Sequence, residues 1–482
     1  MIKPYKILIF ILLTFSLLGL LGFVFPKEGV EIGTIVLSFP SPESVFTTEE
    51  DQTIDIEQTL ATLKQQTDIS RMRSLADSLL FYREFISQNT ARFYFPNDNY
   101  LFFDKLFARL EKAKTASRSL HILHYGDSQI EMDRISSIFR QYLQEKFEGE
   151  GAGVVPPIQT IPTFTVRQSY SGALSRYVVY GDTSQPRASH RRYGLLANFA
   201  QLNGSASITV GSSNYRQAQE KTKQFSRLAL IIGNNAAGFS VACQSKEYAV
   251  KEAQKGVKVM TWDFNTPVSQ VSLRMTGKAE IYGVSLEGKS GITVDNIPLR
   301  GCSGTIFTRI DSLVLKQCYE QMNVCMIILQ FGGNMMPQIN SQKAIDRYME
   351  SITRQINYLQ RLNPSAPVLF IGPSDMSKRV NGKMQTYPYL SELNDALKAT
   401  VLKNNAAYWD MFHVMGGENA MLAWVKHVPA WAGSDYIHFT EAGANQIATT
   451  LSDAFMVYYQ FYALRKMANP ELIERFLRQN QK

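Results

Sequence analysis

Short apolar segments with the character of strands recur along this chain and alternate with segments of helical spacing. The strand-like segments are residues 120–125, 281–286, 325–331, 367–371 and 406–410, and a final helix is predicted to begin at Glu441. Apolar strands separated by helices are typical of a parallel sheet that helices cover on both faces. We therefore predict an α/β fold for these parts of the chain.

The length of the chain, 482 residues, is enough for two or three folded units. Between the first two strand-like segments, short β runs are separated by Gly, Asn, Ser and Asp, which predicts an inserted β-sandwich. Helical spacing also precedes the first strand, where we expect a segment that packs on the α/β body. The predicted units are an N-terminal helical segment (54–119), an α/β domain (120–157 and 281–465), an inserted β-sandwich (158–280) and a C-terminal helical tail (466–482).

Residues 7–25 contain no charged side chain, and a helix of this length spans about 28 Å, close to the hydrocarbon thickness of a bilayer. Lys3 and Lys6 precede this run, so the positive-inside tendency places the chain after Pro26 on the extracytoplasmic, periplasmic side. We predict a membrane anchor within residues 1–26 and a linker at 27–53. No small-residue cleavage site follows the run, which favours an uncleaved anchor over a removed signal peptide.

The composition limits the classes of partner. The formal net charge of +8 is mild for this length, so we predict no nucleic-acid partner. The four cysteines, Cys243, Cys302, Cys318 and Cys325, allow three full disulfide pairings, and the sequence does not choose among them. Their spacing matches no zinc site, and no cluster of His, Asp and Glu has metal-ligand spacing, so we predict neither a metal nor a cofactor.

Gly126, Asp127 and Ser128 stand between the first strand and a helix predicted at 131–147. A serine at such a junction projects its hydroxyl from the carboxyl edge of a parallel sheet, close to backbone N–H groups that stabilise negative charge. A lone Gly-Asp-Ser is more often a helix cap, so the strand before it is what makes Ser128 a candidate nucleophile.

Asp435 and His438 lie three residues apart, just before the final helix. One helical turn brings such residues to the same side, and a serine nucleophile needs both a base and an acid that orients the base. A surface loop without a catalytic role is the alternative interpretation.

Asn334 follows Gly332 and Gly333 after the strand at 325–331. Two glycines permit a tight turn at the sheet edge, and the side-chain amide of Asn334 can then point to a substrate oxygen. In isolation such a segment is usually only a turn.

Gly301 lies in the loop that follows the strand predicted at 281–286. Its backbone N–H is a candidate second donor to an anion. Gly304 and Gly291 are alternatives for the same role.

Along the chain the four motifs follow one another as Gly126-Asp127-Ser128, Gly301, Gly332-Gly333-Asn334 and Asp435-Tyr436-Ile437-His438. In that order they resemble the blocks of the SGNH (GDSL-like) hydrolase family. The resemblance implies a flavodoxin-like three-layer α/β/α fold and a serine esterase in which Ser128 is the nucleophile, His438 the general base and Asp435 the residue that orients it. It also implies an oxyanion hole formed by the backbone N–H groups of Ser128 and Gly301 and by the side chain of Asn334.

The resemblance covers residues 120–462 apart from the β insert, and this chain departs from the family pattern at two positions. Gln129 stands where the family often has Leu, and Met335 stands where it often has Asp. Neither change removes a catalytic group.

An α/β body with an inserted β-sandwich is also similar to bacterial enzymes that remove O-acetyl groups from peptidoglycan, in which the insert resembles a carbohydrate-binding module. We therefore predict an esterase that acts on an O-acylated cell-envelope glycan, such as peptidoglycan. Two alternatives stay open: an O-acetyltransferase that uses the same triad, and a catalytically inactive glycan-binding protein.

The insert contains candidate sugar-stacking aromatic residues, although aromatic side chains of a β-sandwich more often belong to its core. They are Tyr170, Tyr177, Tyr180, Tyr193 and Trp262.

Five of the six histidines lie outside the motifs. His121 and His124 lie in the strand before Ser128, where we expect buried, hydrogen-bonded structural histidines. His413 and His427 receive no predicted role.

Overall fold

The structure, a computed structural model, describes residues 4–24, 30–32, 35–37, 56–67, 75–215 and 219–467. Helix α1 (Pro4–Val24) covers most of the run predicted as a membrane anchor, and β1 (Val30–Ile32) and β2 (Ile35–Leu37) form a hairpin within the predicted linker. Among the described helices, none combines the length and the apolar character needed to cross a membrane. The remainder of the predicted linker, and the predicted tail beyond Met467, lie outside the described residues.

Within the described residues, six strands form a mainly parallel sheet in the order β13-β4-β14-β15-β18-β3. Five of these strands are parallel, and β3 pairs antiparallel with β18 at one edge. The strands are β3 (Phe93–Tyr94), β4 (Leu120–Gly126), β13 (Ile292–Pro298), β14 (Val324–Gln330), β15 (Val368–Ile371) and β18 (Ala407–Trp409). Numbered along the chain, the parallel strands have the order 2-1-3-4-5, which is the flavodoxin-like order that the family resemblance predicted. The order reverses between β4 and β14, so the carboxyl ends of these two strands flank the crevice where such sheets bind ligands.

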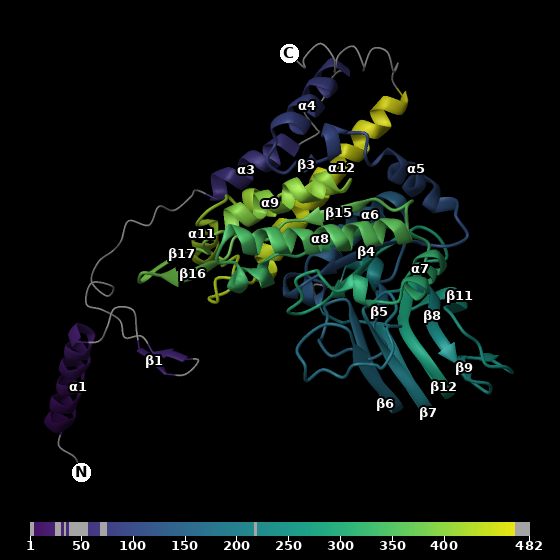
Figure 1. Ribbon diagram of the computed structural model, residues 1–482. Coiled ribbons are helices and arrows are strands. Elements are labelled where there is room, and N and C mark those ends of the chain that lie inside the picture. Colours follow the sequence, from purple (N-terminus) through teal and green to yellow (C-terminus); the bar gives the residue numbers. More distant parts are fainter. Residues whose placement is uncertain are drawn as a thin grey trace.

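Helices cover both faces of this sheet (Figure 1). Along β14, Ile328 faces one buried cluster, which includes side chains of α6 and α12, whereas Ile327 and Leu329 face a second cluster with side chains of α7, α8 and α9. Because successive residues of a strand point to opposite faces, the sheet is buried on both sides, and the predicted α/β/α layers are confirmed. The helices are α5 (Asp104–Lys112), α6 (Ser136–Phe147), α7 (Ser312–Gln321), α8 (Gln342–Leu362), α9 (Leu390–Lys403), α10 (Met411–Val414), α11 (Ala420–Lys426) and α12 (Glu441–Met467).

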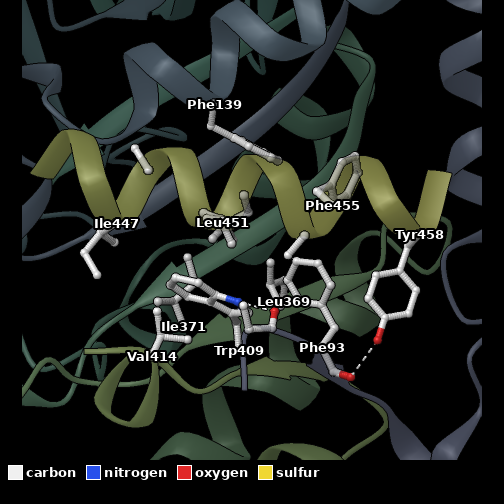
Figure 2. Close-up of a cluster of buried hydrophobic side chains, with 14 of the residues drawn as sticks. Phe93, Phe139, Leu369, Ile371, Trp409, Val414, Ile447, Leu451, Phe455 and Tyr458 are labelled. Carbon is white, nitrogen blue, oxygen red and sulfur yellow. Dashed lines mark hydrogen bonds between the residues drawn. The ribbon is translucent and has the colours of Figure 1, made fainter. Parts of the chain in front are cut away.

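The cluster on the α12 side is rich in aromatic side chains (Figure 2). The ring of Phe455 lies 5.3 to 6.4 Å from the rings of Phe93, Phe103 and Phe139. Tyr458 donates a hydrogen bond to the carbonyl of Phe93 at 3.2 Å. Burial of each such ring stabilises the fold by roughly 1.5–3 kcal/mol, so this cluster fixes the last helix on the sheet.

The N-terminal helices α3 (Ile56–Thr67) and α4 (Leu75–Gln88) pack on the same cluster, as their helical spacing predicts. Tyr82 of α4 lies with its ring 5.1 Å from that of Phe461 in α12. The indole N–H of Trp409 donates to the carbonyl of Ala91 at 2.9 Å. The segment before β4 is therefore part of the packed body.

A second sheet lies between α6 and β13 in the sequence, and within the described residues it has eight strands that pair antiparallel. The long strand β12 pairs with β7 and β9 along its first part and with β8 and β5 along its last part. The sheet has its own buried cluster, which includes Leu230, Trp262 and Leu273. Its strands are β5 (Gly153–Val155), β6 (Val166–Val178), β7 (Asn198–Ser212), β8 (Phe225–Asn235), β9 (Ser240–Cys243), β10 (Lys246–Ala249), β11 (Lys258–Val268) and β12 (Gln270–Glu287).

One strand of the prediction was placed in the wrong sheet. Residues 281–286, predicted for the parallel sheet, form the end of β12, and the parallel strand is β13 instead. The antiparallel sheet consequently extends from Gly153 to Glu287 rather than from 158 to 280. A buried apolar run looks the same in either kind of sheet, whereas β13 carries Asp295 and Asn296 at its centre and does not stand out as apolar.

Most of the aromatic residues proposed for sugar stacking belong to the core. Tyr193 and Trp262 are 4% and 2% exposed, and Tyr177 and Tyr180 pack against a buried cluster. Tyr170 is the exception among the five, with 48% of its surface exposed.

Candidate active site

Ser128 lies directly after the carboxyl end of β4, at the start of a 3₁₀ turn, η4 (Ser128–Asp133). The Asp127 side chain caps this turn by accepting a hydrogen bond from the N–H of Gln129 at 3.0 Å. The helix predicted from residue 131 begins only at Ser136, because Glu131 and Met132 have non-helical backbone angles. We call residues 126–134 the nucleophile turn.

Ser128 and His438 are 310 residues apart in the sequence but lie side by side in the structure. The Oγ atom of Ser128 lies 2.7 Å from Nε2 of His438, and Nδ1 of His438 lies 2.7 Å from Oδ2 of Asp435. When Nδ1 carries the proton and donates it to Asp435, Nε2 accepts from the serine hydroxyl. The three residues that the sequence predicted as a triad therefore form a continuous hydrogen-bonded row.

The segment that carries the base, residues 431–440, is called the base loop here. Asp435 accepts hydrogen bonds from the N–H groups of Ile437 and His438, both at 3.0 Å, besides the imidazole bond. Partial burial alone would raise the pKa of Asp435, but the hydrogen bonds from His438 and the backbone outweigh it and hold the pKa below its ordinary value. Asp435 is therefore an ionised partner for the imidazole at neutral pH.

Asn334 follows β14 in a second 3₁₀ turn, η7 (Gly333–Gln338), where Gly332 adopts φ +135. Its Nδ2 atom donates to Oδ2 of Asp127 at 3.2 Å and to the carbonyl of Cys302 at 3.3 Å. Both bonds are long, so an oxyanion can compete with the Cys302 carbonyl for one amide hydrogen.

Gly301 lies in the loop after β13, with φ +72 and open space where a Cβ atom would stand. The two alternatives occupy other environments: the N–H of Gly304 bonds to Sγ of Cys302, and the N–H of Gly291 bonds to the carbonyl of Ala113. Of the three glycines, only Gly301 lines the same cavity as Ser128. Cys302 and the other three cysteines all lie in the described residues, where each is a buried free thiol.

A cavity of about 480 Å³ opens at these residues. Ser128, Gly301, Asn334 and His438 all line it, at the carboxyl edge of the sheet beyond the ends of the neighbouring strands β4 and β14. Asp435 stands behind His438, as an orienting acid does. Among the described residues, no group of three or more His, Cys, Asp or Glu side chains has the arrangement of a metal site.

Asp127 is a second unusual group at the cavity. Its carboxyl is 5% exposed, and burial raises its pKa to about 6, although hydrogen bonds from Gln129 and Asn334 and the charge of His438 oppose this shift.

Three further polar residues of the nucleophile turn were not identified from the sequence as site residues. Arg134 donates to the carbonyl of Phe439 at 2.7 Å. Glu131 accepts two hydrogen bonds of 2.6 Å from Arg300, the neighbour of Gly301. Gln129 contacts the base loop. No sequence signal marks these contacts, because the partners are far apart along the chain.

The two histidines of β4, His121 and His124, are buried and hydrogen-bonded, as predicted for structural residues. His121 contacts Asp295 and Glu287 at 2.8 and 3.0 Å, and His124 contacts Gln330 and Ser136 at 3.1 and 2.9 Å. Both imidazoles are buried.

Part of the chain matches a known protein family. Residues 276–445 match the GDSL-like Lipase/Acylhydrolase family, and this stretch contains Gly301, Asn334, Asp435 and His438. The chain contains a GDSL-like lipase/acylhydrolase domain. This domain is of the SGNH ester-hydrolase type, and the Gly126-Asp127-Ser128 motif precedes the matched residues because the antiparallel sheet separates them.

The GDSL-like hydrolase is also similar to solved structures. A peptidoglycan O-acetylesterase aligns with a TM-score of 0.61 at 17% identity, covering 74% of this chain and 96% of the other. A carbohydrate acetylesterase from Sinorhizobium meliloti aligns with a TM-score of 0.25 at 12% identity, covering 34% of this chain and 78% of the other. The first of these comparisons shows a common fold over most of both chains. A comparison with curated proteins found no match.

Proposed function

We propose that this GDSL-like hydrolase is a serine esterase that removes O-acetyl or similar short acyl groups from a cell-envelope glycan such as peptidoglycan. The observation that carries the proposal is the row from Asp435 through His438 to Ser128, with both hydrogen bonds at 2.7 Å, beside an open cavity.

In the acylation step, Oγ of Ser128 bonds to the carbonyl carbon of the ester while its proton passes to Nε2 of His438. Asp435 stabilises the imidazolium that results. The negative charge on the carbonyl oxygen is held by the N–H groups of Ser128 and Gly301 and by the amide of Asn334. The carbon–oxygen bond to the sugar then breaks, and His438 returns the proton to the departing sugar oxygen.

In the deacylation step, water takes the place of the sugar. His438 removes a proton from the water as its oxygen bonds to the acyl carbon, and the bond to Oγ of Ser128 breaks. The proton passes to Ser128, which releases a carboxylic acid and restores the free enzyme.

The choice of an envelope glycan rests on two supports. One is the likeness in fold to a peptidoglycan O-acetylesterase over most of both chains. The other is the inserted antiparallel sheet between β4 and β13, an insertion that the resemblance to peptidoglycan O-acetylesterases implies and on which Tyr170 is exposed for contact with a sugar.

The test is acetate release by the full-length protein, in detergent, from O-acetylated peptidoglycan, O-acetylated xylan and an aryl acetate. Ser128→Ala is expected to lose activity by a factor of about 10³ or more while its circular dichroism stays unchanged, because the hydroxyl is the nucleophile and supports no core. Ser351→Ala is the matched control, because Ser351 on α8 is half-buried like Ser128 but does not line the cavity. Near-normal activity of Ser128→Ala would refute the serine-esterase assignment.

The same assay separates the two alternative functions. An acetyltransferase would pass the acyl group from the aryl acetate to an added glycan faster than to water, and mass spectrometry of the glycan detects that product. A glycan-binding protein without catalysis would bind the polymer and release no acetate from any of the three substrates.

The cellular location is a separate proposal that rests on the sequence. We propose that residues 1–26 hold the catalytic body at the extracytoplasmic face of a membrane, because residues 7–25 carry no charge and Lys3 and Lys6 precede them. Recovery of the full-length protein in the soluble fraction after cell lysis would contradict it.

A further inference from the structure

Gln129, the residue after the nucleophile, has a buried side chain whose amide contacts the base loop. Its Nε2 atom donates to the carbonyl of Ile437 at 2.6 Å and to Oγ of Ser374 at 3.1 Å. Its Oε1 atom accepts from the N–H of Phe439 at 3.3 Å. The residue is 7% exposed, so these bonds are shielded from water.

The two base-loop partners belong to the peptide groups on either side of His438. The carbonyl of Ile437 belongs to the peptide bond before His438, and the N–H of Phe439 to the peptide bond after it. Each peptide group is planar, so holding both restrains the position of the His438 Cα atom and the direction of its Cα–Cβ bond, while Asp435 holds the imidazole ring. One side chain adjacent to Ser128 thus holds the backbone of the base on both sides.

We propose that Gln129 is a positioning residue that sets the distance between Oγ of Ser128 and Nε2 of His438. This inference rests on the esterase function proposed above, and it goes beyond the triad and the oxyanion hole. Gln129 does not take part in bond making. It acts through His438, which must lie within hydrogen-bond reach of the serine for proton transfer.

The chemistry of the amide explains why a glutamine suits this position. The carbonyl of Ile437 needs a donor and the N–H of Phe439 needs an acceptor, and an amide supplies both. A leucine, which the family often has here, supplies neither, and an ionised glutamate supplies only the acceptor. The departure from the family pattern at this residue therefore has a structural counterpart in the base loop.

Other hydrogen bonds also hold the base loop, so we expect removal of the Gln129 amide to reduce kcat without abolishing activity. Arg134 donates to the carbonyl of Phe439 at 2.7 Å, and Asp435 accepts from the N–H of His438 at 3.0 Å. Removal of the Gln129 amide should therefore loosen the loop without unfolding it. A misplacement of about 1 Å in such a row can reduce the rate roughly 10²-fold.

The experiment uses the full-length protein and an aryl acetate. Gln129→Met keeps a buried side chain of similar length without donor or acceptor, and we expect kcat to fall roughly 10- to 10²-fold with KM within about threefold. Gln129→Glu keeps the size and loses the donor at neutral pH, and we expect it to lose kcat as well, which would exclude a change of volume as the cause.

Gln355 provides a matched control, because it is also a buried glutamine whose side-chain amide both accepts and donates a hydrogen bond. It is 3% exposed, accepts from the N–H of Thr308 at 3.0 Å and donates to Oγ1 of Thr308 at 3.2 Å. Gln355→Met is expected to lower the melting temperature about as much as Gln129→Met and to leave kcat within about twofold.

A second measurement reports on Ser128 directly. An aryl sulfonyl fluoride modifies an activated serine, and intact mass spectrometry follows the rate. The rate is expected to fall in Gln129→Met in parallel with kcat, and to stay at the wild-type value in Gln355→Met.

Three outcomes would overturn the inference. In the first, Gln129→Met keeps kcat within about twofold. In the second, its KM rises at constant kcat, which makes Gln129 a substrate-binding residue. In the third, both glutamine variants lose activity only in proportion to their unfolded fraction. Failure of the esterase proposal is distinguishable, since the wild-type protein would then neither hydrolyse the ester nor react with the sulfonyl fluoride at Ser128.

Discussion

At the scale of single residues, a buried carboxyl, that of Asp127, holds the amide proposed for the oxyanion hole, that of Asn334. Asp127 accepts from Asn334, and its pKa is raised to about 6 by burial, so the group is largely ionised at neutral pH. A hydrogen bond to a charged acceptor is stronger than one between neutral groups, so Asp127 orients the Asn334 amide before substrate arrives. Only the interaction with the carbonyl of Cys302 has to be exchanged for the oxyanion.

The first prediction at this scale concerns Asn334→Ala. We expect kcat to fall roughly 10²- to 10³-fold with little change in KM, because the amide acts on charge that develops in the transition state. Steady-state kinetics with an aryl acetate measures both constants. Asn340→Ala, in the exposed segment after η7, is the control and should match the wild type. A raised KM at unchanged kcat would make Asn334 a binding residue.

The residues of the triad could be predicted because each stands in a short motif at the end of a strand. The residues that hold the triad could not. Gln129 and Ile437 are 308 residues apart in the sequence, and Arg134 and Phe439 are 305 apart, so no local pattern joins them. Gln129 was visible only as a departure from the family pattern, and its meaning required the geometry of the base loop.

At the scale of elements, the join between the two sheets is where sequence prediction failed. β12 ends at Glu287 and β13 begins at Ile292, and the two strands enter different sheets. The apolar pattern could not show which strand belongs to the parallel sheet. The end of β12 is an apolar run, whereas β13 contains buried polar residues. A buried charged cluster accounts for Asp295, because His121 of β4 lies between Asp295 of β13 and Glu287 of β12.

The pH dependence of this cluster follows from the directions of two pKa shifts. Burial would lower the pKa of His121, but the charges of Asp295 and Glu287 outweigh burial and raise it to about 10. Its stabilising contribution is therefore complete below the unfolded value of about 6.5 and is lost as the pH rises through about 10. The pKa of Glu287 is lowered, since the charge of His121 outweighs burial, so its contribution is lost as the pH falls below about 4.5.

The prediction at the element scale is that His121→Ala destabilises the fold by about 3–5 kcal/mol near pH 6, because it leaves two carboxylates buried without their partner. The loss should shrink as the pH falls below about 4.5 and as it rises from about 6.5 through about 10, because the wild-type contribution itself is lost over these ranges. Urea denaturation followed by circular dichroism measures the free energy of unfolding at each pH.

His413→Ala serves as the comparison for that series. His413 pairs with Asp410 at 2.9 Å, but 45% of its side chain is exposed, so we expect a loss of about 1 kcal/mol or less. Equal losses of unfolding free energy in the two variants would show that the buried His121 cluster stabilises the fold no more than a partly exposed ion pair does.

At the scale of the whole molecule, the two sheets share a core. Tyr125 of β4, Phe199 of β7 and Tyr282 of β12 belong to one buried cluster, and the hydroxyl of Tyr125 donates to the carbonyl of Leu195 at 2.7 Å. Domains that unfold separately usually have few contacts between them. The shared core therefore favours one cooperative unit in which the antiparallel sheet supports the carboxyl edge that carries Ser128.

The last prediction tests this cooperativity with Phe199→Ala. Phe199 is 1% exposed, and its ring lies 5.3 Å from that of Tyr177 and 6.3 Å from that of Tyr282, so truncation should cost about 3–5 kcal/mol. Leu273→Ala is the partner variant, because Leu273 lies in the cluster that belongs to the antiparallel sheet alone. If the molecule is one unit, both substitutions shift the urea midpoint of esterase activity together with that of the circular dichroism signal. Esterase activity that survives in Leu273→Ala after the β signal is lost would instead mean that the antiparallel sheet unfolds as a separate domain.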